Sequence, residues 1–231
     1  PRGPRTQIHP MTVVTGVMCR SIRDICRYYD VTAGYDSRDP YSLPKVEGWE
    51  HHLGSYLKDL RGAKVAIVPD LGVAKVNPAV ADMVREAGEF LALDVGLQVV
   101  DLELSFPGLG YEWALGNLAS LYADLEGLWP DCREQLTNEI SFGLGIAQKH
   151  YSLDMMARSE TARTAANEAV AAAFDQVDFI ISATNPDVAF AAETYLNLEV
   201  AGEEAGPENN GALTIPYNIV GNPSLQVPIG Q

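Results

Sequence analysis

A repeat of apolar residues at helical spacing begins after position 77. One face is expected to carry Val80, Met83, Val84, Ala87, Phe90 and Leu91, and the opposite face Asp82, Arg85, Glu86 and Glu89. This spacing predicts an amphipathic helix. Asn77 and Pro78 supply an N-cap followed by a proline at the first helical position, and Gly96 closes the helix.

Short apolar runs lie on both sides of this helix. Residues 65–68 (VAIV) stand between Gly62 and Pro69, and residues 97–104 (LQVVDLEL) follow Gly96. Strand, helix and strand in this order form a βαβ unit, which predicts parallel pairing and a right-handed crossover.

The remaining elements follow from local signals. Ser21, with Asp24 three places on, predicts a helix over 22–33. The chain from 111 to 174 reads as mostly helical, with one long helix over 147–174. That helix has a small-residue face, which comprises Ala162, Ala165, Ala166, Ala169 and Ala173.

Three predictions concern the last third of the chain. Residues 177–182 read as a third strand and residues 201–211 as a polar surface loop. Residues 225–229 read as a final buried strand entered from a Gly-Asn-Pro turn. No linker divides the chain, so an α/β fold in one domain is expected over residues 1–231. Because ligands gather at the carboxyl ends of parallel strands, the loops to inspect are 69–77, 183–190 and 214–224.

The net charge of the chain makes some classes of binding partner unfavourable. The 231 residues carry a formal net charge of −15, which disfavours non-specific binding to nucleic acid or to an anionic membrane. No apolar run approaches 18 residues. Cys19, Cys26 and Cys132 lack the spacing of a metal site, so we expect buried free thiols in a reducing compartment and neither metal nor cofactor.

Two short motifs match catalytic or dinucleotide-binding patterns only by letters. Residues 42–45 match SxxK by letters, but the prolines around them predict a loop, in which the lysine would not stack over the serine. Gly143-Leu-Gly145 lacks the third glycine of a dinucleotide motif and follows no convincing strand.

Four stretches in order resemble the second half of the amidase signature family. They begin at positions 16, 60, 174 and 218, and read GVMCRSIRDICRYYDVTAGYDSRDPYS, LRGAKVAIVPDLG with the helix and strand after it, FDQVDFIISATNPDVAF and NIVGNPSLQVPIG. The last two are similar to the family's Phe-Asp-x-x-Asp…Thr-Pro-Thr-Thr-Pro and Asn-x-x-Gly-x-Pro…Val-Pro-x-Gly patterns.

The resemblance implies a fold and an activity. The fold would be a mixed, mostly parallel sheet covered by helices on both faces. The activity would be hydrolysis of amides by a Lys–cis-Ser–Ser triad without a cofactor, in a cytoplasmic enzyme that forms a homodimer. The family's Gly-Gly-Ser-Ser-Gly-Gly segment is not found in these residues. We therefore expect a partial amidase domain, truncated at both ends, whose nucleophile lies upstream and which contains no catalytic residue.

The resemblance also assigns residues to the substrate pocket. They are Thr184, Asn185, Pro186 and Phe190 from one loop, and Asn218, Gly221, Asn222 and Pro223 from a second. Turn chemistry is the alternative explanation: asparagine and glycine tolerate left-handed backbone, and proline sets φ. For Gly221 and Pro223 the structural explanation is favoured, whereas for Asn218 and Asn222 both explanations stand.

One departure from the family bears on the substrate. The A subunits of tRNA-dependent amidotransferases carry arginines before the glycine that opens the long helix, where this chain has Asn138 and Glu139. A glutamate there would repel a glutamine carboxylate. This favours a general amidase over the A subunit of an aminoacyl-tRNA amidotransferase. A non-catalytic pseudo-amidase or split subunit is the third possibility.

Overall fold

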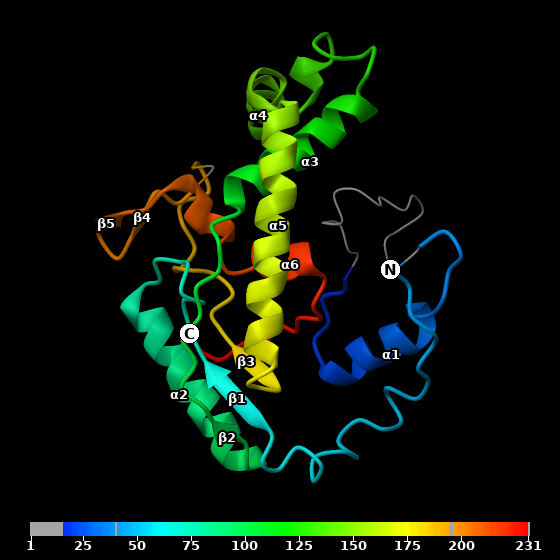
Figure 1. The fold of residues 1–231 in the computed structure, drawn as a ribbon, viewed down its shortest axis with the longest axis vertical. Helices are drawn as coiled ribbons and strands as arrows, with labels where there is room; N and C mark the ends of the chain where they lie inside the picture. Colours follow the sequence, from blue (N-terminus) through cyan, green and yellow to red (C-terminus); the bar gives the residue numbers. More distant parts are fainter. Residues whose placement is uncertain (1–15, 40, 195, 231) are drawn as a thin grey trace.

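The computed structural model describes residues 16–39, 41–194 and 196–230. The elements are α1 (Ile22–Thr32), β1 (Lys64–Ile67), α2 (Pro78–Val95), β2 (Gln98–Val99), α3 (Gly110–Asp124), η1 (Arg133–Gln135), α4 (Asn138–His150), α5 (Leu153–Phe174), β3 (Phe179–Ile181), β4 (Glu199–Val200), β5 (Glu203–Glu204), η2 (Pro207–Gly211) and α6 (Ile215–Val220). The sheet and α2 lie at one end of the molecule, α3 and α4 at the other, and α5 spans the distance between them (Figure 1).

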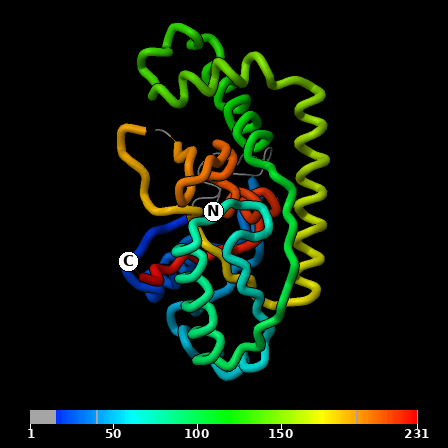
Figure 2. The backbone as a smooth tube through the Cα atoms, turned by 90° about the vertical axis from the view of Figure 1, so that its left-hand side faces the viewer, coloured from blue at the N-terminus to red at the C-terminus, as the bar shows by residue number. Residues whose placement is uncertain are grey.

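The larger sheet has the order β2-β1-β3, and both pairings are parallel. Val65 of β1 is paired with Val99 on one side and with Phe179 on the other. The predicted βαβ unit is therefore confirmed. The strands are shorter than predicted, and β2 covers only two residues of the run 97–104. Beyond it the chain runs alongside α5 (Figure 2), where Leu102 is buried against Ala173.

Helices cover both faces of β1, as the expected fold requires. On one face α2 approaches so closely that a Cβ built on Gly88 would lie 3.0 Å from the side chain of Ile67. On the other face Ala66 is buried with Ala173 at the end of α5 and with Val177. Since burial of apolar surface is the main favourable term in folding, this sandwich positions the ends of the strands.

The local helix signals are confirmed. The side chain of Ser21 accepts from the Asp24 amide, that of Asn77 accepts from Ala79, and Gly96 has φ 82°. The predicted face of α2 is partly wrong: Phe90 is 71% exposed, and Leu91 is exposed too. The buried positions are Ala81, Val84, Gly88 and Ala92. Small residues turn towards the sheet because the helix approaches it so closely.

The helical region contains separate helices. The predicted helix over 147–174 is broken at Tyr151 and Ser152, and the Ser152 side chain caps α5 by accepting from the Met155 amide. Ala166 and Ala173 are buried as predicted, whereas Ala165 is exposed. All three cysteines are free, as predicted, but only Cys26 is buried, since Cys19 is exposed and Cys132 is half-buried.

The prediction of a plain polar loop over 201–211 is wrong. The segment includes β5 of the antiparallel pair β4–β5 and the short helix η2, and Asn209 is only 7% exposed. Ala201 and Gly202 form the turn between the strands with φ of 52° and 84°. Alanine is uncommon in that conformation, so the pattern of residue types did not indicate a tight turn.

The predicted strand over 225–229 is also wrong. α6 ends at Gly221, and the chain from 222 to 230 has no regular secondary structure and forms no ladder with any strand of the described residues. Leu225, Val227 and Ile229 are exposed. A strand requires a partner for its backbone groups, which an apolar run does not by itself provide.

Candidate functional site

The chain segments that follow the three parallel strands meet at one end of the sheet. Leu71 follows β1, Phe106 follows β2 and Ala183 follows β3, and all three are buried in one apolar cluster with Leu213. A backbone hydrogen bond from Ala183 to the Pro69 carbonyl, 3.1 Å long, extends the pairing of β1 and β3. Since ligands of open parallel sheets bind beyond the carboxyl ends of the strands, this region is the candidate site.

The turn after β1 is tight. Leu71 has φ 52° and is fully buried, and Gly72 has φ 65°. A Cβ on Gly72 would overlap the carbonyl of Leu104, so glycine is required there for both its backbone and its size. A buried leucine in left-handed conformation costs on the order of 1–2 kcal/mol, which the surrounding cluster offsets.

Asn77 joins the loop after β1 to the loop after β3. Its backbone N–H donates to the Pro186 carbonyl at 2.8 Å. Its side-chain oxygen caps α2 through the Ala79 amide, and its side-chain nitrogen donates to Asp187 Oδ1 at 2.8 Å. One residue therefore fixes the start of α2 and the course of residues 184–187.

Asp187 gathers donors from three parts of the chain. The Val188 amide donates to Oδ1 at 2.8 Å and Asn197 Nδ2 to Oδ2 at 3.4 Å, and the Ala201 amide is also a donor. Partial burial raises the pKa of this carboxyl, but the hydrogen bonds, that from Asn77 first, outweigh burial and hold the pKa below its usual value. Asp187 is therefore an anion at neutral pH.

A second set of contacts fastens residues 197–211, here called the arm. Asn209 Oδ1 accepts from the Lys75 amide at 2.8 Å, and Asn209 Nδ2 donates to the Lys75 carbonyl at 2.9 Å. Lys75 Nζ donates to Glu203 Oε2 at 3.0 Å and to the Glu204 carbonyl at 2.9 Å. Within the arm, Asn210 pairs in the same two-bond manner with the backbone of Asn197.

A cavity of about 260 Å³ opens beside these contacts. Its lining comprises Val73, Lys75, residues 107–110, residues 204–206, Glu208, Asn209, Ala212, Ile215 and Pro216. Segments that follow β1 and β2 thus meet residues of the arm and the start of α6 around one hollow. The apolar walls and few polar groups match the composition of small-molecule sites, although the volume is slightly below their usual range.

The loop after β3 holds half of the eight predicted site residues. Pro186 is buried, Thr184 is half-buried, Asn185 is exposed and Phe190 is 47% exposed. The loop joins the site through neighbours of these residues, since Ala183 lies in the apolar cluster.

The other four predicted residues belong to α6 and the chain after it. Asn218 lies within α6, Gly221 ends the helix with φ 82°, and Asn222 and Pro223 follow. Tyr217 packs on the same cluster as Ala183, so the two loops approach one core. None of the eight residues lines the 260 Å³ cavity.

α6 carries two buried polar atoms. Within the described part of the chain, neither the Tyr217 hydroxyl nor Asn218 Oδ1 has a hydrogen-bond partner. The ring of Tyr217 stands edge-on to Phe106, with centroids 6.0 Å apart. Burial raises the pKa of the Tyr217 hydroxyl to about 12, so the phenol is neutral and can donate.

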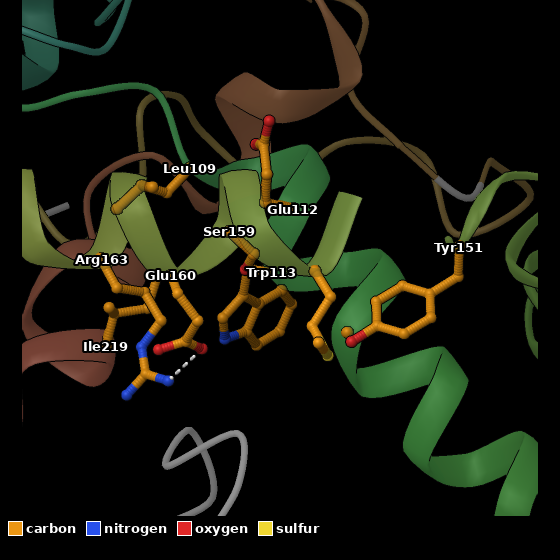
Figure 3. A pocket seen from close by; sticks show the side chains of 10 residues that line it. Leu109, Glu112, Trp113, Tyr151, Ser159, Glu160, Arg163 and Ile219 are labelled. Carbon is orange, nitrogen blue, oxygen red and sulfur yellow. Dashed lines mark hydrogen bonds and ion pairs between the residues drawn. The ribbon is translucent and has the colours of Figure 1, made fainter. Parts of the chain in front are cut away.

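A smaller cavity of about 20 Å³ lies among α3, α5 and α6, with Trp113, Arg163 and Ile219 in its wall (Figure 3). Arg163 Nη1 donates to Glu160 Oε1 at 2.9 Å. Within the described residues, Trp113 Nε1 and Arg163 Nε are buried without a partner. The volume suits about one water molecule rather than a substrate.

The remaining sequence motifs stay outside the site. The Ser42 hydroxyl donates to the Asp39 carbonyl at 2.7 Å in a loop, and Gly143 and Gly145 lie inside α4. The described ranges contain no group of three or more His, Cys, Asp or Glu side chains arranged to hold a metal ion. Among the helices in those ranges, none combines the length and apolarity needed to cross a membrane.

A family model described as "Amidase" matches residues 1–231. The chain belongs to the amidase family. Within this family it is 28% identical, over 247 residues, to the A subunit of the glutamyl-tRNA(Gln) amidotransferase of Methanospirillum hungatei, with 94% of this chain and 53% of that protein covered. The corresponding protein of Zymomonas mobilis is 23% identical over 243 residues, with 93% and 47% covered. The chain spans about half the length of these curated relatives.

Solved structures support the amidase signature fold. A bacterial aryl acylamidase of that enzyme family superposes with a TM-score of 0.75 at 25% identity, covering 92% of this chain and 45% of the other. The A subunit of a glutamyl-tRNA(Gln) amidotransferase from Thermotoga maritima superposes with a TM-score of 0.55 at 16% identity, covering 87% and 42%, and supports the fold alone.

Sequence reasoning missed the residues that hold the candidate site together, which are Asp187, Asn209 and Lys75. Asp187 lies within the resemblance motif, directly after Pro186, and an aspartate after a turn proline is a local signal that could have indicated it. Asn209 and Lys75 are 134 residues apart, and no local pattern links them.

Proposed function

We propose that the full-length protein hydrolyses carboxylic acid amides to an acid and ammonia or an amine through a serine acyl-enzyme. The observation that carries the proposal is the match to the amidase family over the whole chain, supported by the structural likeness to an aryl acylamidase. The serine and its lysine partner belong, in this proposal, to a part of the protein outside these residues. A cytoplasmic homodimer is the expected setting.

The proposed reaction has two steps. The serine oxygen attacks the amide carbonyl carbon, and the C–N bond breaks as the leaving nitrogen takes a proton. Water then cleaves the ester and releases the acid. The loop with Thr184, Asn185, Pro186 and Phe190, and the turn with Asn218, Gly221, Asn222 and Pro223, would form the wall against the acyl group.

The names of the curated relatives support a second candidate, the A subunit of a glutamyl-tRNA(Gln) amidotransferase. In the sequence Glu139 counts against it, although α4 lies at the end of the molecule away from the sheet, and Glu139 does not line the 260 Å³ cavity (Figure 1). This exposed carboxylate lies in the first turn of α4, where the helix dipole favours an anion. A glutamine carboxylate brought to that position would meet a like charge, whereas a neutral acyl group would not.

Turnover by the purified full-length protein tests both candidates. The substrates are an acetylated aryl amine, a short aliphatic amide, and glutamine with and without glutamyl-tRNA. Release of amine or ammonia from the neutral amides, together with a mass increase of one acyl group on a serine, is the expected result. Glutamine turnover that depends on glutamyl-tRNA would favour the second candidate. No turnover and no acylated serine would reject both.

A further inference from the structure

We infer that Asp187 is a positioning residue for the proposed amidase: it holds the loop with Thr184, Asn185 and Pro186 and the arm against the start of α2, and thereby sets the affinity for substrate. The inference rests on the proposed function, and it concerns a residue that lines neither cavity.

The contacts of Asp187 support this role. Its carboxylate accepts from Asn77 before α2, from Val188 in its own loop, and from Asn197 and Ala201 in the arm. These segments lie up to 124 residues apart in sequence (201 minus 77). One side chain therefore contacts three segments that no strand pairing joins within the described residues, and it adds to the contacts of Lys75 that also fasten the arm.

The chemistry of these contacts calls for a carboxylate. Every contact named for Asp187 comes from an N–H donor, and an ionised carboxylate is an acceptor at both oxygens. An amide at this position would turn one NH₂ group towards another donor. Hydrogen bonds to a charged acceptor are also about twice as strong as neutral ones. Asp187 therefore cannot be replaced by asparagine without loss of position.

The loop and the arm that Asp187 contacts both carry residues proposed to lie against the substrate. The loop bears the proposed acyl-wall residues, and the arm lines the 260 Å³ cavity with residues 204–206 and Asn209. Displacement of both would weaken contacts made equally to substrate and transition state. Such a loss raises KM and leaves kcat nearly unchanged.

An exchange of side chains between positions 77 and 187 of the full-length protein tests the inference. In Asp187→Asn two amides face each other, and in Asn77→Asp two carboxylates do. Each single variant is expected to raise KM about tenfold with kcat within about twofold of wild type. The double variant restores one amide and one carboxylate, because aspartate at 77 also caps α2, and is expected to return KM to within about threefold. Asp82→Asn, which removes an exposed carboxylate paired with Arg85 on α2, is the matched control.

Hydrogen–deuterium exchange provides a readout that needs no turnover. Amides of the arm are expected to exchange faster in Asp187→Asn and to regain protection in the double variant. The Val188 amide is expected to stay unprotected in both, because the atom that replaces Oδ1 and faces position 77 is then an NH₂ donor. Unchanged protection in Asp187→Asn, or a loss of kcat with unchanged KM, would overturn the inference. If wild type hydrolyses no amide, the proposed function fails, and exchange alone then decides whether Asp187 holds the arm.

Discussion

Asn209 pairs with the backbone of Lys75 as a neighbouring strand would. Its side-chain oxygen accepts from the Lys75 N–H at 2.8 Å, and its side-chain nitrogen donates to the Lys75 C=O at 2.9 Å. Both partners lie beyond the end of β1, where the ladder of the sheet has stopped. The amide of one asparagine therefore replaces a missing strand and attaches the arm to the loop that lines the larger cavity.

Loss of this pairing should weaken the fold. Asn209→Ala leaves a half-buried N–H and C=O of Lys75 without partners, and we expect the free energy of unfolding to fall by about 2 kcal/mol. Urea denaturation measures the change. Asn210→Ala is the matched control, since Asn210 makes the same two-bond contact at a more exposed position. Equal losses in both variants would contradict the special role of Asn209.

The turn after β1 should not accept a side chain. Gly72→Ala places a methyl group on the Leu104 carbonyl at φ 65°, and we expect a loss of more than about 2 kcal/mol. Gly145→Ala provides the contrast: this glycine lies inside α4 with open space around it, so alanine should stabilise by up to about 1 kcal/mol. The two midpoints of thermal unfolding should therefore move in opposite directions.

Tyr217 should make stability depend on pH in the alkaline range. Its pKa is raised from the ordinary value near 10 to about 12, so the folded state keeps a proton that the unfolded state releases between these values. Stability should therefore fall as pH rises from about 10 to about 12. Tyr217→Phe should remove this part of the slope. The variant should not lower stability at pH 7, because the hydroxyl has no hydrogen-bond partner among the described residues. An unaltered alkaline slope in the variant would refute the assignment.

Glu139 should have only a modest effect on the preference between charged and neutral substrates. Glu139→Arg is expected to improve kcat/KM for an amide with an anionic acyl group by about two- to fivefold, because exposed charge pairs contribute below about 1 kcal/mol. Glu134→Arg, the same change at an exposed position in η1, controls for net charge. A parallel gain in both variants would indicate general attraction rather than a contact near the substrate.

Local chemistry explains what could be predicted from the sequence. Ser21, Asn77 and Gly96 act within three or four residues of their own position, and their caps form as predicted. The parallel sheet also follows, because the crossover helix leaves few alternatives for its strands. The eight predicted site residues came from a family resemblance, and their contact with substrate stays a prediction.

Non-local geometry explains the rest. The face of α2 is decided by how closely Gly88 approaches Ile67, which spacing alone does not reveal. The structure of the arm depends on Asn209 meeting Lys75 and on Asp187 meeting Ala201. These pairings join residues distant in sequence, and single-residue patterns carry no information about them.

The exposed residues after α6 have a consequence for handling the protein. Leu225, Val227 and Ile229 are exposed at alternate positions and pair with no strand of the described residues, so we expect the segment to be able to add as a strand to an exposed sheet edge of another copy. Pro223 and Pro228 lack N–H groups and bracket residues 224–227. Any strand pairing through this segment is therefore confined to residues 224–227, without Ile229, so we expect association to be concentration-dependent and reversible rather than amyloid-like.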